Sequence, residues 1–250
     1  MKKILLATLS ICIVFFAWAQ KRNDLTDKSL YNDTFSPEVV IDPQYGITMY
    51  EPLNMMLGKD TVRNDQNGYA ANGYLEDYYT TGQLMHKGFY VDGQLKIYKN
   101  FYPNGNVERN FRLVDLKKSR MTLYYEDGTV KSEITYIMSE AIKWEDYYKN
   151  GQLEFVEEYD KSMQYYKFKA NYFENGSPEN TLEMTDKKKL VYTQSYYYAN
   201  GNLKEQGEMQ YDKAMFDYKR IGSWKLFNES GVPTKLQKYA SGDVVSEKDL

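Results

Sequence analysis

The sequence is poor in the residues on which most catalytic and metal-binding sites depend. His86 is its only histidine and Cys12 its only cysteine. A histidine-based triad or a site with several histidine ligands cannot be built from one copy, so we interpret His86 as a structural strand residue. Cys12 lies in an apolar segment near the N-terminus, and the stretch from Leu9 to Cys12 resembles a lipobox only loosely. If Cys12 leaves with that segment, disulfides, thiol nucleophiles and thiolate metal sites are excluded together.

Long apolar runs are equally scarce, because Ile4–Phe16 is the one run of that kind. It follows Lys2 and Lys3 and precedes the small residues of Ala17-Trp18-Ala19, which is the layout of a secretory signal peptide. A membrane span takes about 20 apolar residues, and this run is shorter. We therefore predict a signal peptide over residues 1–19 and no integral membrane segment in the mature chain. Export would lead to the periplasm, the outer-envelope surface or the exterior.

Positive charge is not in excess either. The formal net charge is −3, and loss of Lys2 and Lys3 with the signal peptide would change it to −5. A nucleic-acid-binding domain carries a basic patch or stripe, so nucleic acid is not an expected partner. Neighbouring carboxylates such as Glu157 and Glu158 could in principle support acid–base chemistry, but they alternate with lysines as on a solvated strand face. We expect no enzyme, no cofactor and no metal site.

What the sequence has in abundance is a repeated phrase, in which two aromatic residues precede a turn that contains glycine. Successive copies are 23, 23, 23, 25, 25 and 30 residues apart. The turn glycines are Gly82, Gly105, Gly128, Gly151, Gly176, Gly201 and Gly231. Most follow Asn or Asp, and these dipeptides favour two-residue hairpin loops with both central residues at positive φ. We predict such a hairpin turn at each glycine.

The residues around the turns alternate as strands do. Val130, Ile134 and Tyr136 alternate with Lys131, Glu133 and Thr135, and a period of two predicts a half-buried strand. Each unit then returns through a second, looser turn. The sequence predicts an all-β chain, an antiparallel β-hairpin meander in a single twisted sheet or open solenoid, with about seven units of about 23 residues. We expect a polar leader and N-terminal cap over residues 20–66, repeats over 67–239 and a flexible C-terminal tail over 240–250.

Tyrosine is unusually frequent, with 26 of 250 residues, and two columns of the repeat are aromatic. The column four residues before each glycine contains Tyr78, Phe101, Tyr124, Tyr147, Tyr172, Tyr197 and Phe227. We predict that its rings form an aromatic ladder between successive units. The next column contains Tyr79, Tyr102, Tyr125, Tyr148, Phe173 and Tyr198. Adjacent strand residues point to opposite faces, so we predict that this second column forms a binding surface, unless both faces are covered.

A glycine-containing hairpin of this length with paired aromatics resembles the MORN repeat. It is most similar to the bacterial variant found in proteins labelled as YwqK-type antitoxin components. The stretches Tyr147–Leu153 and Gly222–Phe227 carry the resemblance, which extends over about Gly68–Tyr239. The resemblance implies a sheet of stacked hairpins. An antitoxin role is implied by the family label alone, and such a role is expected in the cytoplasm rather than beyond a signal peptide.

These observations favour a non-enzymatic, secreted or envelope-associated repeat protein that acts as a scaffold for another protein. The first alternative is a module that binds carbohydrate or a surface polymer, because tyrosine rings offer stacking area and a hydroxyl. The antitoxin role is the second alternative. Whether the chain forms a homo-oligomer stays open.

Overall fold

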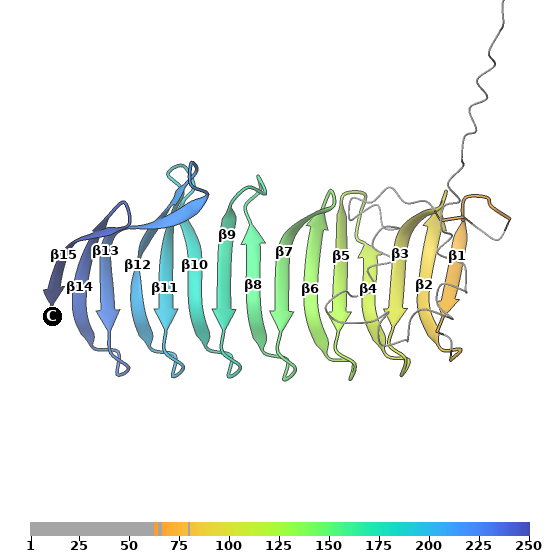
Figure 1. The fold of residues 1–250 in the computed structure, drawn as a ribbon, viewed down its shortest axis with the longest axis horizontal. Coiled ribbons are helices and arrows are strands. Elements are labelled where there is room, and N and C mark those ends of the chain that lie inside the picture. The colour runs from red at the N-terminus through yellow and green to blue at the C-terminus, as the bar shows by residue number, and fades with distance from the viewer. Residues whose placement is uncertain (1–62, 65–66, 80) are drawn as a thin grey trace, which may run out of the picture.

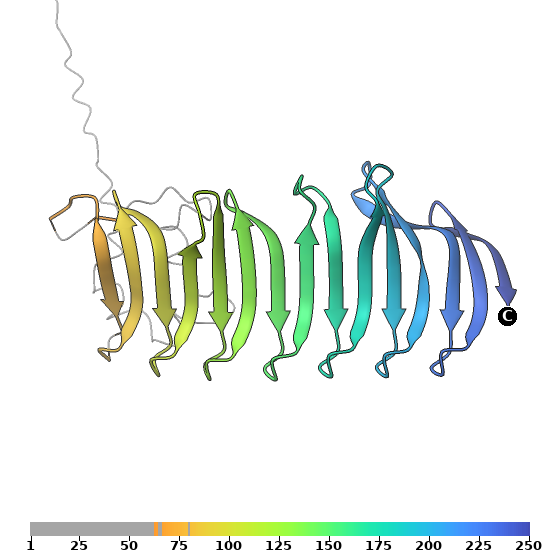
Figure 2. The same ribbon diagram turned by 180° about the vertical axis from the view of Figure 1, so that it is seen from behind.

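The computed structural model describes residues 63–64, 67–79 and 81–250. They form one open sheet of antiparallel strands in which each strand is hydrogen-bonded to its neighbours in sequence. Figures 1 and 2 show the strands side by side in chain order along the long axis. The fifteen strands are β1 (Gly73–Tyr78), β2 (Leu84–Val91), β3 (Gln94–Phe101), β4 (Val107–Leu113), β5 (Lys118–Tyr124), β6 (Val130–Ile137), β7 (Glu140–Tyr147), β8 (Leu153–Tyr159), β9 (Tyr166–Tyr172), β10 (Pro178–Asp186), β11 (Val191–Tyr197), β12 (Leu203–Asp212), β13 (Asp217–Phe227), β14 (Pro233–Ala240) and β15 (Asp243–Asp249).

This arrangement confirms the predicted all-β hairpin meander. The predicted signal peptide (1–19) and, apart from Arg63 and Asn64, the predicted leader and cap (20–66) lie outside the described residues. The part of the chain that the structure describes contains no helix with the length and apolar character needed to cross a membrane.

The C-terminal residues differ from the expected flexible tail, because most of them form β15. This strand pairs with β14 in antiparallel register from Asp243 to Asp249. Lys235 Nζ lies 2.6 Å from a carboxylate oxygen of Glu247, and Gln237 Nε2 donates to Glu247 at 2.7 Å. β15 has little apolar character of its own. Backbone pairing with β14 and these polar side-chain contacts hold it in the sheet.

The glycine turns lie along the side of the sheet formed by the strand ends at the bottom of Figure 1, and we call this side the glycine-turn edge. The loops of these turns are longer than predicted. In the turn between β3 and β4, the Gly105 N–H donates to the Tyr102 carbonyl at 2.9 Å, and the Tyr102 N–H donates to the Asn106 carbonyl at 2.8 Å. Three residues therefore form the loop. Only the glycine has positive φ, and the seven turn glycines have φ between 81° and 90°. This is a type I turn followed by a left-handed glycine, so the prediction of two-residue loops at these sites is wrong.

Two-residue loops occur instead along the opposite edge, where looser turns were expected. Asp92 and Gly93 join β2 to β3, with φ of 50° and 75°. Met138 and Ser139 join β6 to β7, with φ of 52° and 71°. Both loops have the positive φ at two central residues that the mirror-image type I turn requires. Other turns on this side are longer, such as residues 160–165 between β8 and β9 in a 25-residue step. The 30-residue step takes its extra residues mainly from the longer strands β12 and β13, which have 10 and 11 residues.

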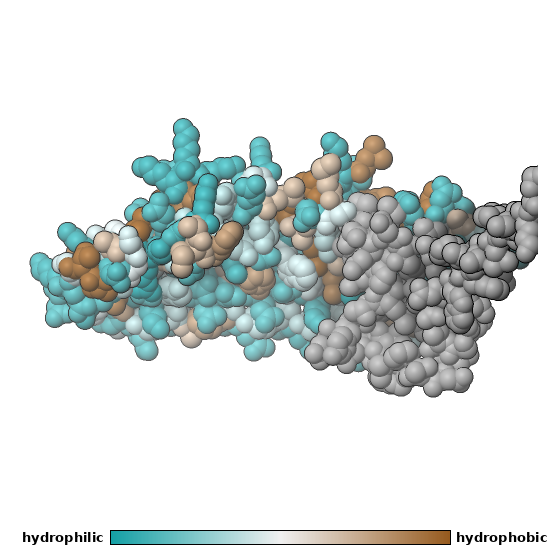
Figure 3. Space-filling model, turned by 45° about the horizontal axis from the view of Figure 1, so that its top comes forward, coloured by the Kyte–Doolittle hydropathy of each residue, from teal (hydrophilic) through white to brown (hydrophobic). Residues whose placement is uncertain are grey.

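The sheet has two unlike faces. Residues paired across neighbouring strands share a face, so the register follows one row from Met121 on β5 through Ile134 on β6 and Trp144 on β7. We call this side the packed face; it also carries Tyr192 on β11 and Trp224 on β13. The other side, which we call the polar face, carries exposed charged residues such as Arg112, Glu133, Glu183 and Glu208. Figure 3 shows hydrophilic side chains over most of the described surface in that view, with hydrophobic ones in small separate groups.

Two apolar clusters occupy the packed face. The first lies on β2–β7 and contains Tyr98, Phe111 and Ile134, with the rings of Tyr98 and Phe111 stacked at 5.4 Å. The second lies on β10–β13 around Tyr192, whose ring meets that of Tyr218 edge-to-face at 5.1 Å. Hydrophobic burial and aromatic contacts are the largest stabilising terms available to the described strands, which form a single sheet.

Candidate functional site

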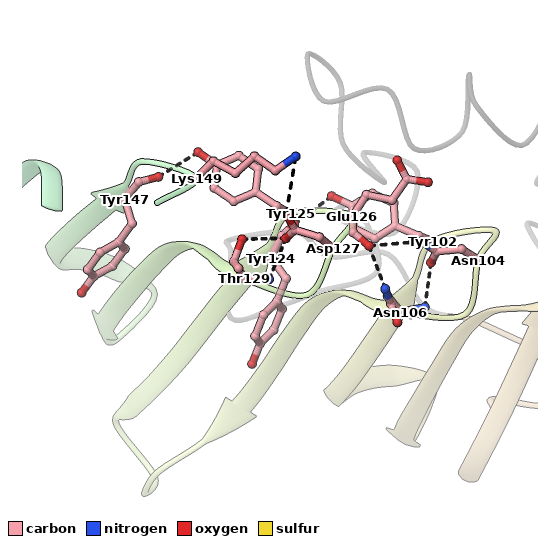
Figure 4. Close-up of polar contacts among 10 residues, drawn as sticks. All are labelled: Tyr102, Asn104, Asn106, Tyr124, Tyr125, Glu126, Asp127, Thr129, Tyr147 and Lys149. Atoms are coloured by element: carbon pink, nitrogen blue, oxygen red, sulfur yellow. Dashed lines mark hydrogen bonds and ion pairs between the residues drawn. The ribbon is translucent and has the colours of Figure 1, made fainter. Parts of the chain in front are cut away.

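Tyrosine hydroxyls connect successive repeats along the glycine-turn edge. The Tyr102 hydroxyl donates to the carbonyl of Tyr124 at 2.8 Å, and the Tyr125 hydroxyl donates to the carbonyl of Tyr147 at 2.8 Å (Figure 4). The same bond recurs from Tyr79 to Phe101, from Tyr148 to Tyr172 and from Tyr198 to Phe227. The hydroxyls of the second aromatic column thus hold one unit to the next. Phe173 is the member of this column that has no hydroxyl.

The predicted aromatic ladder of the first column does not form. In Figure 4 the side chains of Tyr124 and Tyr147 lie in the same orientation in successive units, but no ring contact joins members of this column within the described residues. Successive members are two strands apart, a separation of about 9–10 Å. Aromatic pairs need ring centroids within about 7 Å, so the register places these rings too far apart. The tyrosine hydroxyls bridge this gap instead.

The asparagines of the turns form a second connection between repeats. In the turn that contains Gly105, Asn104 Oδ1 accepts from the Asn106 N–H at 2.9 Å, and Asn104 Nδ2 donates to the carbonyl of Glu126 in the next turn at 3.1 Å. Asp127 has no amide donor at this position and instead lies 3.5 Å from Lys149 Nζ of the following unit. Asparagine is therefore favoured here by its hydrogen bonds rather than by positive φ.

Phe173 provides a test of the tyrosine connection. We expect Phe173→Tyr to stabilise the protein by about 0.5–1.5 kcal/mol, because its hydroxyl would reach the carbonyl of Tyr197 as that of Tyr148 reaches Tyr172. The converse change Tyr148→Phe should destabilise by a similar amount. Urea denaturation measures both. The assignment fails if the two substitutions leave the free energy of unfolding unchanged.

A groove of about 400 Å³ lies on the packed face between the two apolar clusters. Its floor is a single row of side chains that crosses β5–β9, because each member pairs with the next in the strand register. The row consists of Leu123, Ser132, Asp146, Phe155 and Asn171. Four strand spacings make this row about 19 Å long.

Polar side chains and aromatic rings lie side by side in this groove. The Asp146 carboxylate accepts from Ser132 Oγ at 2.5 Å and from Trp144 Nε1 at 2.7 Å, so two donors hold it in place while the Trp144 ring stays half-buried. Tyr125 lines the end near the glycine turns. Burial, and then the charge of Glu154, raise the pKa of the Tyr125 hydroxyl, which stays neutral and donates to the next repeat. The groove therefore offers aromatic surface beside hydrogen-bonding groups of fixed orientation.

The structure brings only part of the predicted binding surface to this groove. Tyr125 lines it, whereas the other members of its column, Tyr79, Tyr102, Tyr148, Phe173 and Tyr198, are not among its lining residues. Sequence reasoning missed Trp144, Asp146, Phe155 and Asn171. A signal for three of them exists in the repeat. The columns five residues before and four residues after the glycine change chemical type from unit to unit, whereas the column four residues before the glycine stays aromatic.

The same row continues into β1–β4 as a buried polar network. His86 has no exposed surface, and its Nδ1 lies 2.6 Å from Asn100 Oδ1 while its Nε2 lies 3.0 Å from the Tyr90 hydroxyl. Tyr90 also accepts from Arg63, which pairs with Asp77. Burial lowers the pKa of His86 to about 4, so the imidazole is neutral at pH 7. These contacts give His86 a structural position within the sheet.

The carboxylates considered for acid–base chemistry do not converge. Glu157 lies on the packed face and Glu158 on the polar face, where Lys167 Nζ contacts it at 2.7 Å. Within residues 63–64, 67–79 and 81–250, no three histidine, cysteine, aspartate or glutamate side chains are grouped so that they could hold a metal ion.

Comparison with known families identifies the repeat. Residues 120–138, 142–161 and 193–211 match the MORN repeat variant, and each matched segment spans one hairpin or its greater part. The chain contains MORN-like repeats. No curated protein matches it. Among solved structures, a mutant of S. aureus TarM in complex with Fondaparinux, alpha-GlcNAc-glycerol and UDP matches at 11% identity and a TM-score of 0.24. A second TarM structure matches at 11% identity and a TM-score of 0.23.

These structural matches cover 59% of this chain and only 21% of the TarM chains. At this identity and TM-score, the match gives no reason to assign a function of TarM to this chain. The MORN repeats support a repeat scaffold as the general class of this protein.

Proposed function

We propose that this MORN-like protein is an exported, non-enzymatic scaffold that binds a segment of another protein in the groove of the packed face. The observation that carries this proposal is the row from Leu123 to Asn171, which places polar side chains and the Phe155 ring beside Trp144 between two filled apolar clusters. Its length of about 19 Å would accept an extended peptide of about six residues. Export rests on the N-terminal sequence pattern of residues 1–19.

The groove has the composition of a protein-binding hot spot. Tryptophan and tyrosine dominate the binding energy of protein interfaces when they lie at the centre of a patch, and Trp144 lines the groove beside Asp146, the middle member of the row. Asp146 and Asn171 can exchange hydrogen bonds with the backbone of an extended peptide.

A matched pair of phenylalanines tests the proposal. Phe155 on β8 lies in the groove, whereas Phe168 on the neighbouring strand β9 is equally half-buried on the polar face. We expect a crosslinked pull-down of the tagged protein from its native cells to recover one dominant partner with the wild type and with Phe168→Ser. Recovery should fall about tenfold or more with Phe155→Ser. Equal recovery with both variants would contradict the assignment to this groove.

Carbohydrate is the second candidate ligand, because the half-buried ring of Trp144 lies next to the carboxylate of Asp146 and the amide of Asn171. A ring that stacks beside planar polar groups suits a sugar as well as a peptide. A glycan array probed with the same two phenylalanine variants separates the candidates. A glycan retained by Phe168→Ser and lost by Phe155→Ser, without a protein partner in the pull-down, would replace the protein-binding proposal.

A further inference from the structure

A second groove, of about 470 Å³, lies on the opposite side of the sheet over β1–β4. Tyr74 and Ile97 form part of its apolar lining, and Lys87, Lys99 and Arg112 surround them. Tyr74 is 61% exposed, and its ring meets that of Phe89 edge-to-face at 5.0 Å. The polar face thus presents an apolar floor inside a rim of cations, although the chain as a whole carries net negative charge.

The register places like charges directly opposite one another at this rim. Lys87 is the cross-strand partner of Lys99, and Arg112 is the partner of Arg120 on β5. Like charges in directly opposed positions destabilise a sheet. Two such pairs therefore make the sheet less stable than neutral residues at the same positions would.

Most of these cations are also without an acidic neighbour. Lys87 Nζ contacts Glu76 at 2.7 Å and lies 5.6 Å from the centre of the Tyr74 ring. Within the described part of the chain, Lys99, Arg112 and Arg120 form no ion pair, and all three are exposed. Their charges are available to a ligand, and an exposed guanidinium can bind a carboxylate through two parallel hydrogen bonds.

We propose that this basic groove binds an acidic segment of a partner protein, with an apolar side chain on the floor formed by Tyr74 and Ile97 and carboxylates on Lys99 and Arg112. An apolar floor suits a leucine or phenylalanine side chain better than a phospholipid headgroup. Glu133 lies exposed on the same face at β6, and it would repel the extended negative charge of an anionic membrane or a nucleic acid. A short acidic segment avoids this carboxylate. The proposal is independent of the groove on the packed face.

The test uses a short fluorescent peptide that alternates glutamate with leucine, and a control peptide in which glutamine replaces every glutamate. We expect the full chain to bind the acidic peptide, with an affinity that falls at high salt, and not the neutral one. Lys99→Thr combined with Arg112→Thr should weaken binding about tenfold or more. Lys225→Thr combined with Lys238→Thr removes the same charge from the polar face of β13 and β14, and should leave binding unchanged.

Thermal unfolding gives a second readout that separates ligand binding from a structural role. Because the substitutions at Lys99 and Arg112 relieve two like-charge pairs, that variant should melt at a higher temperature than the wild type while it loses the peptide. The proposal is overturned if the neutral peptide binds equally well or if the two double variants behave alike. Displacement of the acidic peptide by anionic vesicles or by an oligonucleotide, or a dimer that the Lys99 and Arg112 variant abolishes, would also replace the acidic peptide as the occupant.

Discussion

Gly207→Ala should destabilise the protein by about 3–5 kcal/mol, the cost of losing a buried tryptophan from a core. Gly207 lies on β12 beneath the indole of Trp224, which has no exposed surface. A Cβ added at Gly207 would lie 2.3 Å from Cδ2 and Cγ of the indole. The Arg220 guanidinium lies 3.9 Å from the ring centre and Trp224 Nε1 donates to the Glu208 carbonyl at 3.1 Å, so the ring has little freedom to move aside. We expect the indole to leave its site.

Urea denaturation and tryptophan fluorescence measure this change, with a red shift of the emission as Trp224 becomes exposed. Glu208→Ala, which changes an exposed side chain on the polar face of the same strand, serves as the control and should change the free energy of unfolding by less than about 0.5 kcal/mol. Trp224→Ala should cost nearly as much as Gly207→Ala, and the double variant should cost little more than either, because both act through one contact. Additive effects would contradict the proposed contact between the glycine and the indole.

The hairpin meander could be read from the sequence because one local rule repeats. Alternation around Ile134 fixes which face each side chain takes, and a glycine at a constant position fixes where the chain reverses. The turn geometry could not be read in the same way. Asn104-Gly105 fits both a two-residue loop and a type I turn followed by a left-handed glycine. The turn at Asp127-Gly128 has the same three-residue loop although Asp127 has no amide to donate to the next repeat. The loop length therefore goes with the register of the flanking strands, which the dipeptide alone does not specify.

The groove was missed for a related reason. Repetition marks the constant columns, and the predicted binding surface was therefore a column of tyrosines. The hydroxyls of these tyrosines instead connect the repeats. The groove is built from columns that vary, with Ser132 in one unit and Phe155 at the same position in the next. In a repeat protein each constant position satisfies the same structural requirement in every unit. Positions that differ between units are free of that requirement, and they are the ones where a particular ligand site can be placed.

Asp77→Ala should also destabilise the protein by about 3–5 kcal/mol, because it would leave a buried arginine without its carboxylate. Arg63 forms two hydrogen bonds with Asp77, at 2.6 and 2.8 Å, and a third with the Tyr90 hydroxyl at 3.0 Å. The side chains of Arg63 and Asp77 are only 4% and 11% exposed. Water cannot replace the lost carboxylate at such a depth, so the guanidinium must stay unpaired or the segment that carries it must detach from β1 and β2.

An exposed ion pair of the same length serves as the matched control. Lys235 and Glu247 approach to 2.6 Å between β14 and β15, but their side chains are 33% and 44% exposed. Glu247→Ala should therefore cost no more than about 1 kcal/mol, since solvent screens the pair and hydrates the remaining lysine. Denaturation curves of Asp77→Ala and Glu247→Ala compare a buried ion pair with an exposed one that has the same N–O distance. Replacing both members of the buried pair, with Arg63→Met and Asp77→Leu, should recover most of the loss, because an apolar pair leaves no charge to desolvate. Equal effects of Asp77→Ala and Glu247→Ala would show that Arg63 is not held in the buried position described.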